Sequence, residues 1–434
     1  MRCTRPLRNE AMGGLSLFLS RLTKPLPVVV STEMARRSEF ELLAALDAAP
    51  GTSDLLELLE ATADDEANIV TTARGRCAAL LLRRLDESTR YAPVRAARGA
   101  RRKRAAQAEA DAVAAERRAM RRDERYVWLA ANVSDIEYHD SWSGEAFCSI
   151  MESVASIGGA ALPAALEGMA LGVPRRLERD LHSGSGGEDD DDALSTAQLS
   201  TVAMLLLETC PAADATQHAL ASAARCVAER GLDGTDAATV ADLACSVARG
   251  GVVHIPFVAT VARDVERRAA RGTLRLTAPD ALSRTAWALG RFVADFSVNE
   301  TAASAESVGP PPHGALAALA DEIAARGRSG CLDGRDFNAA AVHRAASGIA
   351  GLCSVRSGSA SPAQIDSAVR ALRVLAGEVE AMSHAPNRAD ELVATLTMVE
   401  LEELAAAFDV AKVRTPGAHA ASAAWWRSVQ NTRQ

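Results

Sequence analysis

Aromatic residues are scarce in this chain, at 4% of the sequence, although hydrophobic residues make up 48% of it. The apolar residues are mainly Ala, Leu and Val, and Ala and Leu lose little side-chain freedom on entering a helix. Alternating runs of β-branched and aromatic residues, which are typical of strands, are missing apart from short stretches at 27–30 and 251–258. The composition therefore predicts an all-α protein.

The eight cysteines form no Cys-x-x-Cys pair, and no histidine stands beside them at a spacing typical of metal ligands. Structural zinc sites depend on such spacings, and disulfide frameworks belong mainly to small secreted chains. We therefore expect the cysteines to act as small apolar residues of helices in a protein of a reducing compartment, and we expect no bound metal and no cofactor. The cysteines are Cys3, Cys77, Cys148, Cys210, Cys226, Cys245, Cys331 and Cys353.

The chain also lacks a long apolar run that could cross a membrane. The best candidate, residues 12–31, contains Arg21 and Lys24 near its middle and two prolines beyond them. A membrane-spanning helix needs about 20 predominantly apolar residues. We therefore expect no membrane insertion.

The first 37 residues are basic and poor in acids. They carry seven Lys or Arg against two acids, with Ser, Thr and Leu between them. This composition is typical of an organellar transit peptide, so residues 1–37 are predicted to direct the protein to a mitochondrion or chloroplast. The alternative is a disordered N-terminus on a cytoplasmic protein.

The net charge of −8 argues against a protein that coats nucleic acid indiscriminately, because such binding needs a broad cationic surface. One segment is nevertheless basic, with twelve Lys or Arg and five acids between residues 90 and 125. On a helix it would form a cationic stripe, which can be a solvated linker or a contact with nucleic acid. The candidate contact residues are Arg101, Arg102, Lys103, Arg104, Arg117, Arg118, Arg121 and Arg122.

Shifts in composition divide the chain into segments. The Gly-Ser-rich and then acidic stretch at 182–194 predicts a flexible loop, and the Ser-rich, Pro-rich stretch at 298–313 predicts an insert. Apolar spacing favours helices at 69–85, 365–382 and 389–408. The remaining predicted segments are a helical hairpin region at 38–89, a basic helix or linker at 90–126, first helical repeats at 127–181, core repeats at 195–297, C-terminal repeats at 314–412 and a tail at 413–434.

The most informative feature is a repeated pattern of an aliphatic residue, three residues, Ala, two residues and an aliphatic residue. It starts at Leu199, Val240 and Leu282, at offsets of 41 and 42, with a looser copy at Val342 and a further start near Phe147. These positions share one face of a helix, and a second helix fits between successive copies. The sequence therefore predicts an α-solenoid of stacked helix pairs with a period of about 40 residues. The alternative is a non-repetitive helical bundle, in which an Ala-rich composition imitates the similarity.

Residues 277–292, with the sequence Thr-Ala-Pro-Asp-Ala-Leu-Ser-Arg-Thr-Ala-Trp-Ala-Leu-Gly-Arg-Phe, resemble the helix of an octotricopeptide repeat and of the related repeats in FAST-kinase-like and RAP-domain proteins. The resemblance extends to residues 190–360 and, faintly, to 38–88, but the other copies lack the tryptophan and no RAP domain is recognised. It implies a protein that binds single-stranded organellar RNA and acts in RNA stability, processing or translation.

Two further arginines, Arg249 and Arg291, recur at one repeat position and could line a groove or cap helix ends. The indole of Trp287, between two alanines, is expected in the core. The predicted inner helices carry Asp242 and few basic or aromatic residues, so we expect few contacts with phosphates and bases.

No catalytic motif is found in the sequence. Three histidines are considered as catalytic residues, but none has a residue of catalytic type near it in the sequence: His139, His254 and His343. We therefore predict that the protein is not an enzyme. The alternative to RNA binding is a protein-binding scaffold of the HEAT or armadillo kind, which an inner groove lined with acids would favour.

Overall fold

The computed structural model describes residues 41–49, 51–63, 75–88, 100–159, 162–182, 193–299, 311–329, 337–354, 360–384, 389–418 and 420–421. Within these ranges every regular element is a helix and no strand occurs, so the predicted all-α class is confirmed. None of the helices in these ranges is long and apolar enough to cross a bilayer.

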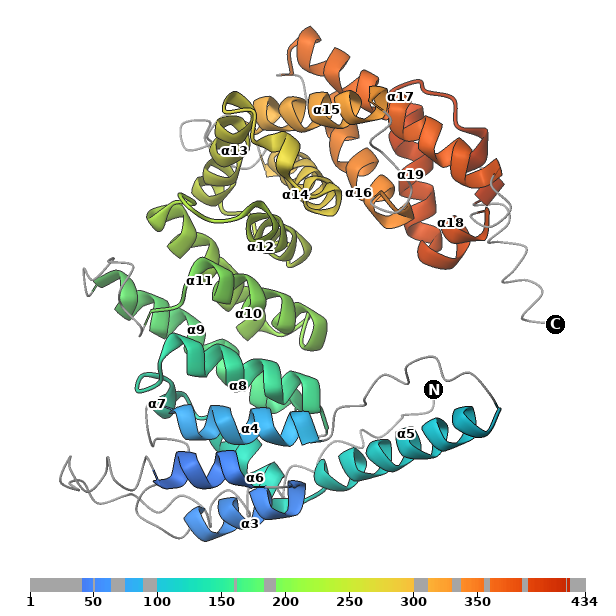
Figure 1. Ribbon diagram of the computed structural model, residues 1–434. Coiled ribbons are helices and arrows are strands. Elements are labelled where there is room, and N and C mark those ends of the chain that lie inside the picture. Colours follow the sequence, from blue (N-terminus) through green and yellow to red (C-terminus); the bar gives the residue numbers. More distant parts are fainter. Residues whose placement is uncertain are drawn as a thin grey trace, which may run out of the picture.

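The helices alternate between two rows, and each helix packs against the next member of its own row (Figure 1). We call them the inner row, on the concave side of the molecule, and the outer row. The inner row contains α4 (Arg76–Ser88), α8 (Gly144–Ile157), α10 (Thr196–Thr209), α12 (Ala237–Arg249), α14 (Pro279–Asn299), α16 (Ala339–Ala350) and α19 (Met398–Val410). The outer row contains α9 (Leu162–His182), α11 (Asp214–Arg230), α13 (Ile255–Ala270), α15 (His313–Arg328) and α17 (Pro362–His384).

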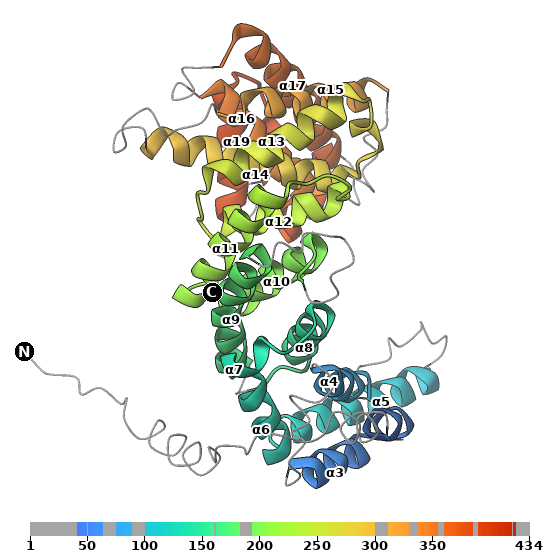
Figure 2. The same cartoon turned by 90° about the vertical axis from the view of Figure 1, so that its left-hand side faces the viewer.

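The remaining helices lie at the two ends of the array. At the N-terminal end these are a helix over residues 41–48, α3 (Thr52–Ala63), α5 (Ala100–Met120), α6 (Glu124–Val133) and α7 (Ile136–His139), and at the C-terminal end α18 (Ala389–Thr395). Figure 2 shows α3, α5 and α6 grouped with α4 at the lower end of the rows, while α6 and α7 pack against α9 and α18 packs against α17. Two 3-10 turns, Leu274–Leu276 and Gly351–Cys353, follow α13 and α16.

The repeated sequence pattern forms the core of the inner row. Its three positions lie one above another on a helix, and in each of five successive inner helices all three side chains are buried. The period-3.6 pattern thus marks the face that packs against neighbouring helices. These residues are Phe147, Met151 and Val154; Leu199, Ala203 and Leu206; Val240, Ala244 and Val247; Leu282, Ala286 and Leu289; and Val342, Ala346 and Ile349.

Side-chain caps set where the inner helices begin. Ser195 and Gln198 form a reciprocal capping box at the start of α10, Asp236 accepts two backbone N–H bonds at the start of α12, and Asn338 caps α16. Such residues satisfy backbone N–H groups that have no partner within the helix. These caps fix the first turn of each of the three helices.

Two glycines let α14 and α16 approach closely. A Cβ added at Gly290 would overlap the backbone of Gly348, and one added at Gly348 would overlap the carbonyl of Ala286. Small residues at facing positions are what such a close approach requires. This contact fixes the wall of the site described below.

The helices predicted at 69–85 and 389–408 need correction. The first begins at Arg76 in α4, and residues 64–74 lie outside the described ranges. The second is two helices, because Thr397 and Glu400 form a capping box that starts a new helix after Leu396. The predicted transit peptide at 1–37 falls outside the described residues, as do nearly all of the loop at 182–194, most of the insert at 298–313 and most of the tail at 413–434.

Candidate binding groove on the inner row

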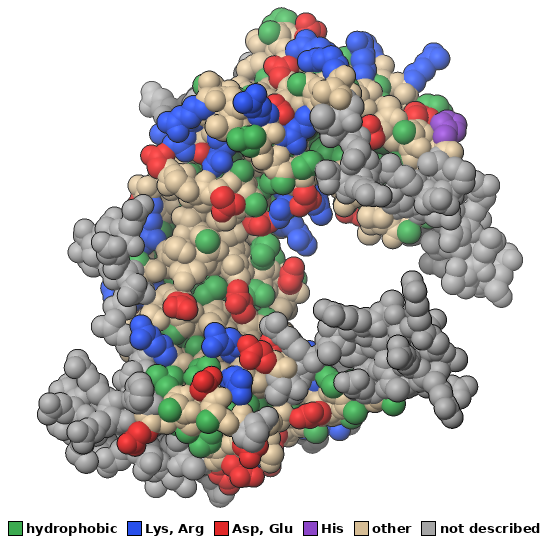
Figure 3. Space-filling model, viewed as in Figure 1, with side chains coloured by type: hydrophobic (Ala, Val, Ile, Leu, Met, Phe, Trp, Pro, Cys, Tyr) green, Lys and Arg blue, Asp and Glu red, His purple; other side chains and the backbone are tan. Residues whose placement is uncertain are grey.

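The concave face of the inner row carries an open cavity of about 760 Å³. Side chains from α10, α12, α14, α16 and α19 line it, and Figure 3 shows it on the hollowed side of the molecule. A second recess of about 360 Å³ lies between α14, α16 and α19. Both are lined by Trp287 and Glu403, so we treat them as one inner groove.

The repeat register explains which residues face this groove. In α12, in α14, and in α16 with the glycine that follows it, the residues two, five and nine places after the first aliphatic residue of the pattern all line one of the two cavities. A helix turns by about 100° per residue, so these positions lie opposite the core face. The three sets are Asp242, Cys245 and Arg249; Arg284, Trp287 and Arg291; and Arg344, Ser347 and Gly351.

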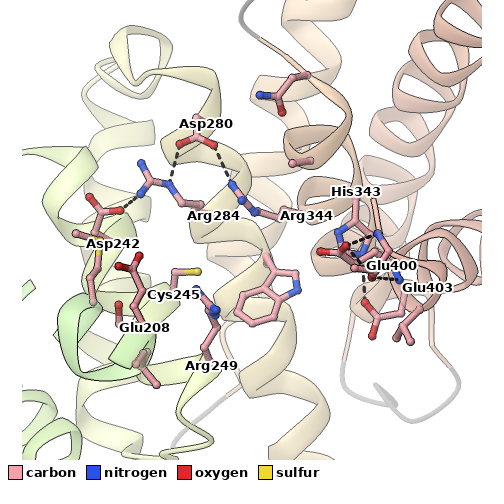
Figure 4. Close-up of a pocket in the computed structure, with 18 residues that line it drawn as sticks. Glu208, Asp242, Cys245, Arg249, Asp280, Arg284, His343, Arg344, Glu400 and Glu403 are labelled. Atoms are coloured by element: carbon pink, nitrogen blue, oxygen red, sulfur yellow. Dashed lines mark hydrogen bonds and ion pairs between the residues drawn. The ribbon is translucent and has the colours of Figure 1, made fainter. Parts of the chain in front are cut away.

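A chain of ion pairs crosses the groove wall (Figure 4). Arg284 pairs with Asp242 of α12 and lies 3.0 Å from a carboxylate oxygen of Asp280. The other oxygen of Asp280 lies 3.0 Å from the Arg344 guanidinium. Burial, and then the charge of Arg344, lower the pKa of Arg284. Two arginines and two aspartates thus balance each other and link three inner helices.

The α19 side of the groove is acidic. Glu403 lies with a carboxylate oxygen 3.1 Å from Nε2 of His343. Glu400 accepts hydrogen bonds from the backbone N–H and the hydroxyl of Thr397, both at 2.8 Å. Burial raises the pKa of Glu400, but these hydrogen bonds and nearby positive charge outweigh burial and leave its pKa below the ordinary value.

Three charged residues of the groove form no such ion pairs or hydrogen bonds within the described part of the chain. Glu208, Arg249 and Arg291 are exposed, and within the described part of the chain no ion pair or hydrogen bond joins their side chains. In Figure 4, Arg249 lies apart from the dashed network around Arg284. These residues are available to a ligand.

Trp287 corrects the expectation of a core tryptophan. Its side chain packs against the core but remains half-buried, and it lines both parts of the groove. The pattern could not place it, because an indole between two alanines fits the core edge and the groove edge of a helix equally well. Its position five places after Leu282 is the signal that could have placed it.

The predicted basic stripe is not one surface. Arg117 pairs with buried Asp86 of α4 at 3.1 Å, and Arg117 and Arg121 both donate to backbone carbonyls at the end of α8, those of Ser156 and Ile157. These two arginines therefore hold α5 against its neighbours, and their assignment as nucleic-acid contacts stays a prediction.

The other candidates on α5 are distributed differently. Arg118 and Arg122 are exposed, while the side chains of Arg101, Arg102, Lys103 and Arg104 lie outside the described residues, although their backbone belongs to α5. Figure 1 places α5 at the N-terminal end of the array, away from α12 and α14, the helices that carry Arg249 and Arg291.

The three histidines considered for catalysis have structural partners. Nε2 of His139 donates to the carbonyl of Val133 at 2.8 Å, and His254 accepts the backbone N–H of Phe257 as the cap of α13. Among the described residues no group of three His, Cys, Asp or Glu is placed to hold a metal ion.

Comparison with known proteins adds no family. No protein-family model matches the chain, and no match was found among curated proteins or among solved structures. The resemblance to octotricopeptide repeats therefore stays a prediction, and the functional argument depends on the groove.

Proposed function

We propose that the protein is an α-solenoid whose inner groove binds an extended segment of a partner protein. The two rows of helices and the common register of the pattern support the solenoid and its period near 40 residues, because each repeat buries its apolar face against its neighbours. The concave surface of such an array presents one helix per repeat to a ligand.

The observation that carries this proposal is the combination of balanced charge and exposed apolar side chains in the groove. Met204, Val399 and Val410 are among the large hydrophobic residues left exposed, and all three line the groove together with half-buried Trp287. Exposed apolar groups gathered in a concave site, with a polar rim, are typical of protein interaction surfaces.

Charge supports a protein partner over nucleic acid. The groove is lined by five acids and four arginines: Glu208, Asp242, Asp280, Glu400 and Glu403 against Arg249, Arg284, Arg291 and Arg344. Binding of a phosphate backbone requires an excess of cations that displaces counterions. The groove has no such excess of cations, which favours the protein-binding scaffold.

Binding of single-stranded RNA in a mitochondrion or chloroplast remains a second proposal. It is supported by the resemblance at residues 277–292 and by the position of Trp287 between two unengaged arginines, Arg249 and Arg291. An exposed aromatic face flanked by cations can stack a base and hold a phosphate.

Affinity purification with matched variants tests the proposal. The full chain and its Met204→Asp/Val399→Asp variant would be purified from the cells that make it, with and without ribonuclease. Leu171→Asp is the control, because Leu171 is an exposed hydrophobic residue of the outer row, 47% accessible. We expect a ribonuclease-resistant protein partner that the groove variant loses and the control keeps. Loss of the partner on ribonuclease treatment, or equal recovery by all three, would contradict a protein-binding groove.

A further inference from the structure

The recess between α14, α16 and α19 has the chemistry of a pocket for an apolar side chain. Its lining includes Gly290, Ala350, Gly351, Ala406 and Ala407, whose small side chains leave its volume unfilled. Half-exposed Val410 and Trp287 complete the wall. At about 360 Å³ it lies within the size range of small-ligand pockets, so it can accept one bulky side chain and adjoining backbone.

Two exposed arginines line the groove, Arg291 in this recess and Arg249 in the larger cavity. Arg249 and Arg291 occupy the same repeat position in α12 and α14, which pack side by side. Arg249 is the last residue of α12, where a cation stabilises a helix end, but Arg291 lies in the interior of α14, where that explanation fails. The planar guanidinium is suited to binding carboxylates in a bidentate manner.

The spacing of the helices constrains a ligand that reaches both arginines. Packed helix axes lie about 8–10 Å apart. An extended chain in the polyproline II conformation repeats its face every three residues and rises about 3.1 Å per residue, or about 9 Å per repeat. A segment that crosses the inner helices therefore presents every third side chain to equivalent positions on successive helices.

We infer that the partner segment carries two carboxylates about three residues apart, bound by Arg249 and Arg291, and then a bulky apolar residue that enters the recess beside Trp287. This inference rests on the proposed function and specifies its ligand. A basic segment would be repelled by the two arginines. A nucleic acid would place further phosphates against Glu208, Glu400 and Glu403, while only one aromatic side chain, Trp287, faces the groove within the described residues.

Selection from a phage library of randomised peptides tests the inference. The immobilised full chain is compared with Arg249→Glu/Arg291→Glu, with Arg249→Gln/Arg291→Gln, and with Arg263→Glu as a control on the exposed side of outer-row helix α13. We expect the native chain and the control to enrich two acids three positions apart followed by an apolar residue. The charge-reversed variant should enrich Lys or Arg at those positions, and the glutamine variant should bind the best acidic peptide at least about tenfold more weakly.

The outcomes separate the inference from the function on which it rests. Enrichment of basic peptides by the native chain, or acidic enrichment that persists in the charge-reversed variant, would overturn the inference and leave a protein-binding groove. If no peptide is enriched while an oligouridylate binds and its binding depends on both arginines, the groove binds nucleic acid. The acidic partner segment and the protein-binding groove are then both overturned. They are also both overturned if neither the peptides nor the oligouridylate bind.

Discussion

Nε2 of His343 lies 3.1 Å from a carboxylate oxygen of Glu403, and this pair joins α16 to α19 at the acidic side of the groove. The His343 side chain is only 5% exposed, whereas that of Glu403 is 47% exposed. The imidazole is therefore fixed by packing, and the carboxylate is held by it. The last inner helix is positioned in part by this contact.

Replacement of His343 by Ala should loosen α19. The change removes a nearly buried ring and its hydrogen bond, and we expect the free energy of unfolding to fall by about 1–3 kcal/mol. Urea denaturation measures the loss, and hydrogen exchange should show faster opening of residues 398–410. The control is His384→Ala, because His384 is 83% exposed and its contact with Glu380, four residues earlier in the same helix, is 3.8 Å long. Equal effects of the two substitutions would argue against a positioning role for His343.

The close contact of α14 and α16 predicts opposite effects for two glycines in helices. In Gly348→Ala the new methyl would overlap the Ala286 carbonyl, so we expect a loss of about 1–3 kcal/mol. Gly377, within α17, has open space around the position of a Cβ, so Gly377→Ala should stabilise the protein by about 0.5–1 kcal/mol. Thermal unfolding of the two variants measures both. A stabilising Gly348→Ala would show that the helices are further apart than described.

The two classes of arginine on α5 should differ in their effect on stability. Arg117→Ala removes the guanidinium that lies 3.1 Å from the almost fully buried carboxylate of Asp86, and we expect a cost of about 1–3 kcal/mol. Arg118→Ala, at an exposed neighbouring position, should change stability by less than about 0.5 kcal/mol. Denaturant midpoints compare the two. If Arg117→Ala leaves the free energy of unfolding unchanged, Arg117 does not hold α5 in place and is a candidate for contact with a ligand.

Three histidines should make the protein sensitive to mild acid. Burial lowers the pKa of His139, His254 and His313, so between those values and the ordinary value of about 6.5 the unfolded chain binds more protons than the folded chain. The free energy of unfolding therefore rises with pH in this window and falls on acidification. We expect the midpoint temperature of thermal unfolding to fall when the pH is lowered from about 7 to about 5.5. His139→Gln should make this dependence of the midpoint temperature on pH less steep. An unchanged slope in His139→Gln would remove His139 from this account.

The inner helices could be predicted because their signal is local. An apolar period of 3.6 marks the packing face of each helix, and Leu199, Val240 and Leu282 are each the fourth residue of a helix in the structure. The break between α18 and α19 was also present in the sequence, as the capping box of Thr397 and Glu400, but the continuous apolar spacing concealed it.

The groove could be predicted only in part. Asp242, Arg249 and Arg291 were visible as inner-helix positions, but the ion pairs among Asp242, Arg284, Asp280 and Arg344 join different repeats and depend on how the helices stack. For the same reason the sequence did not show that Arg117 of α5 pairs with Asp86, 31 positions away. Periodicity gives the face of a helix, whereas the partner of a charge is a tertiary property.

The most direct measurement is site-specific photo-crosslinking from the groove in intact cells. A benzoylphenylalanine would replace Met204, which lines the groove and is 36% exposed, or Arg263 on the outer row as the control. We predict a ribonuclease-resistant crosslink to a discrete protein from position 204 and none of that product from position 263. A crosslink from position 204 to RNA, or the same product from both positions, would contradict a groove that binds protein.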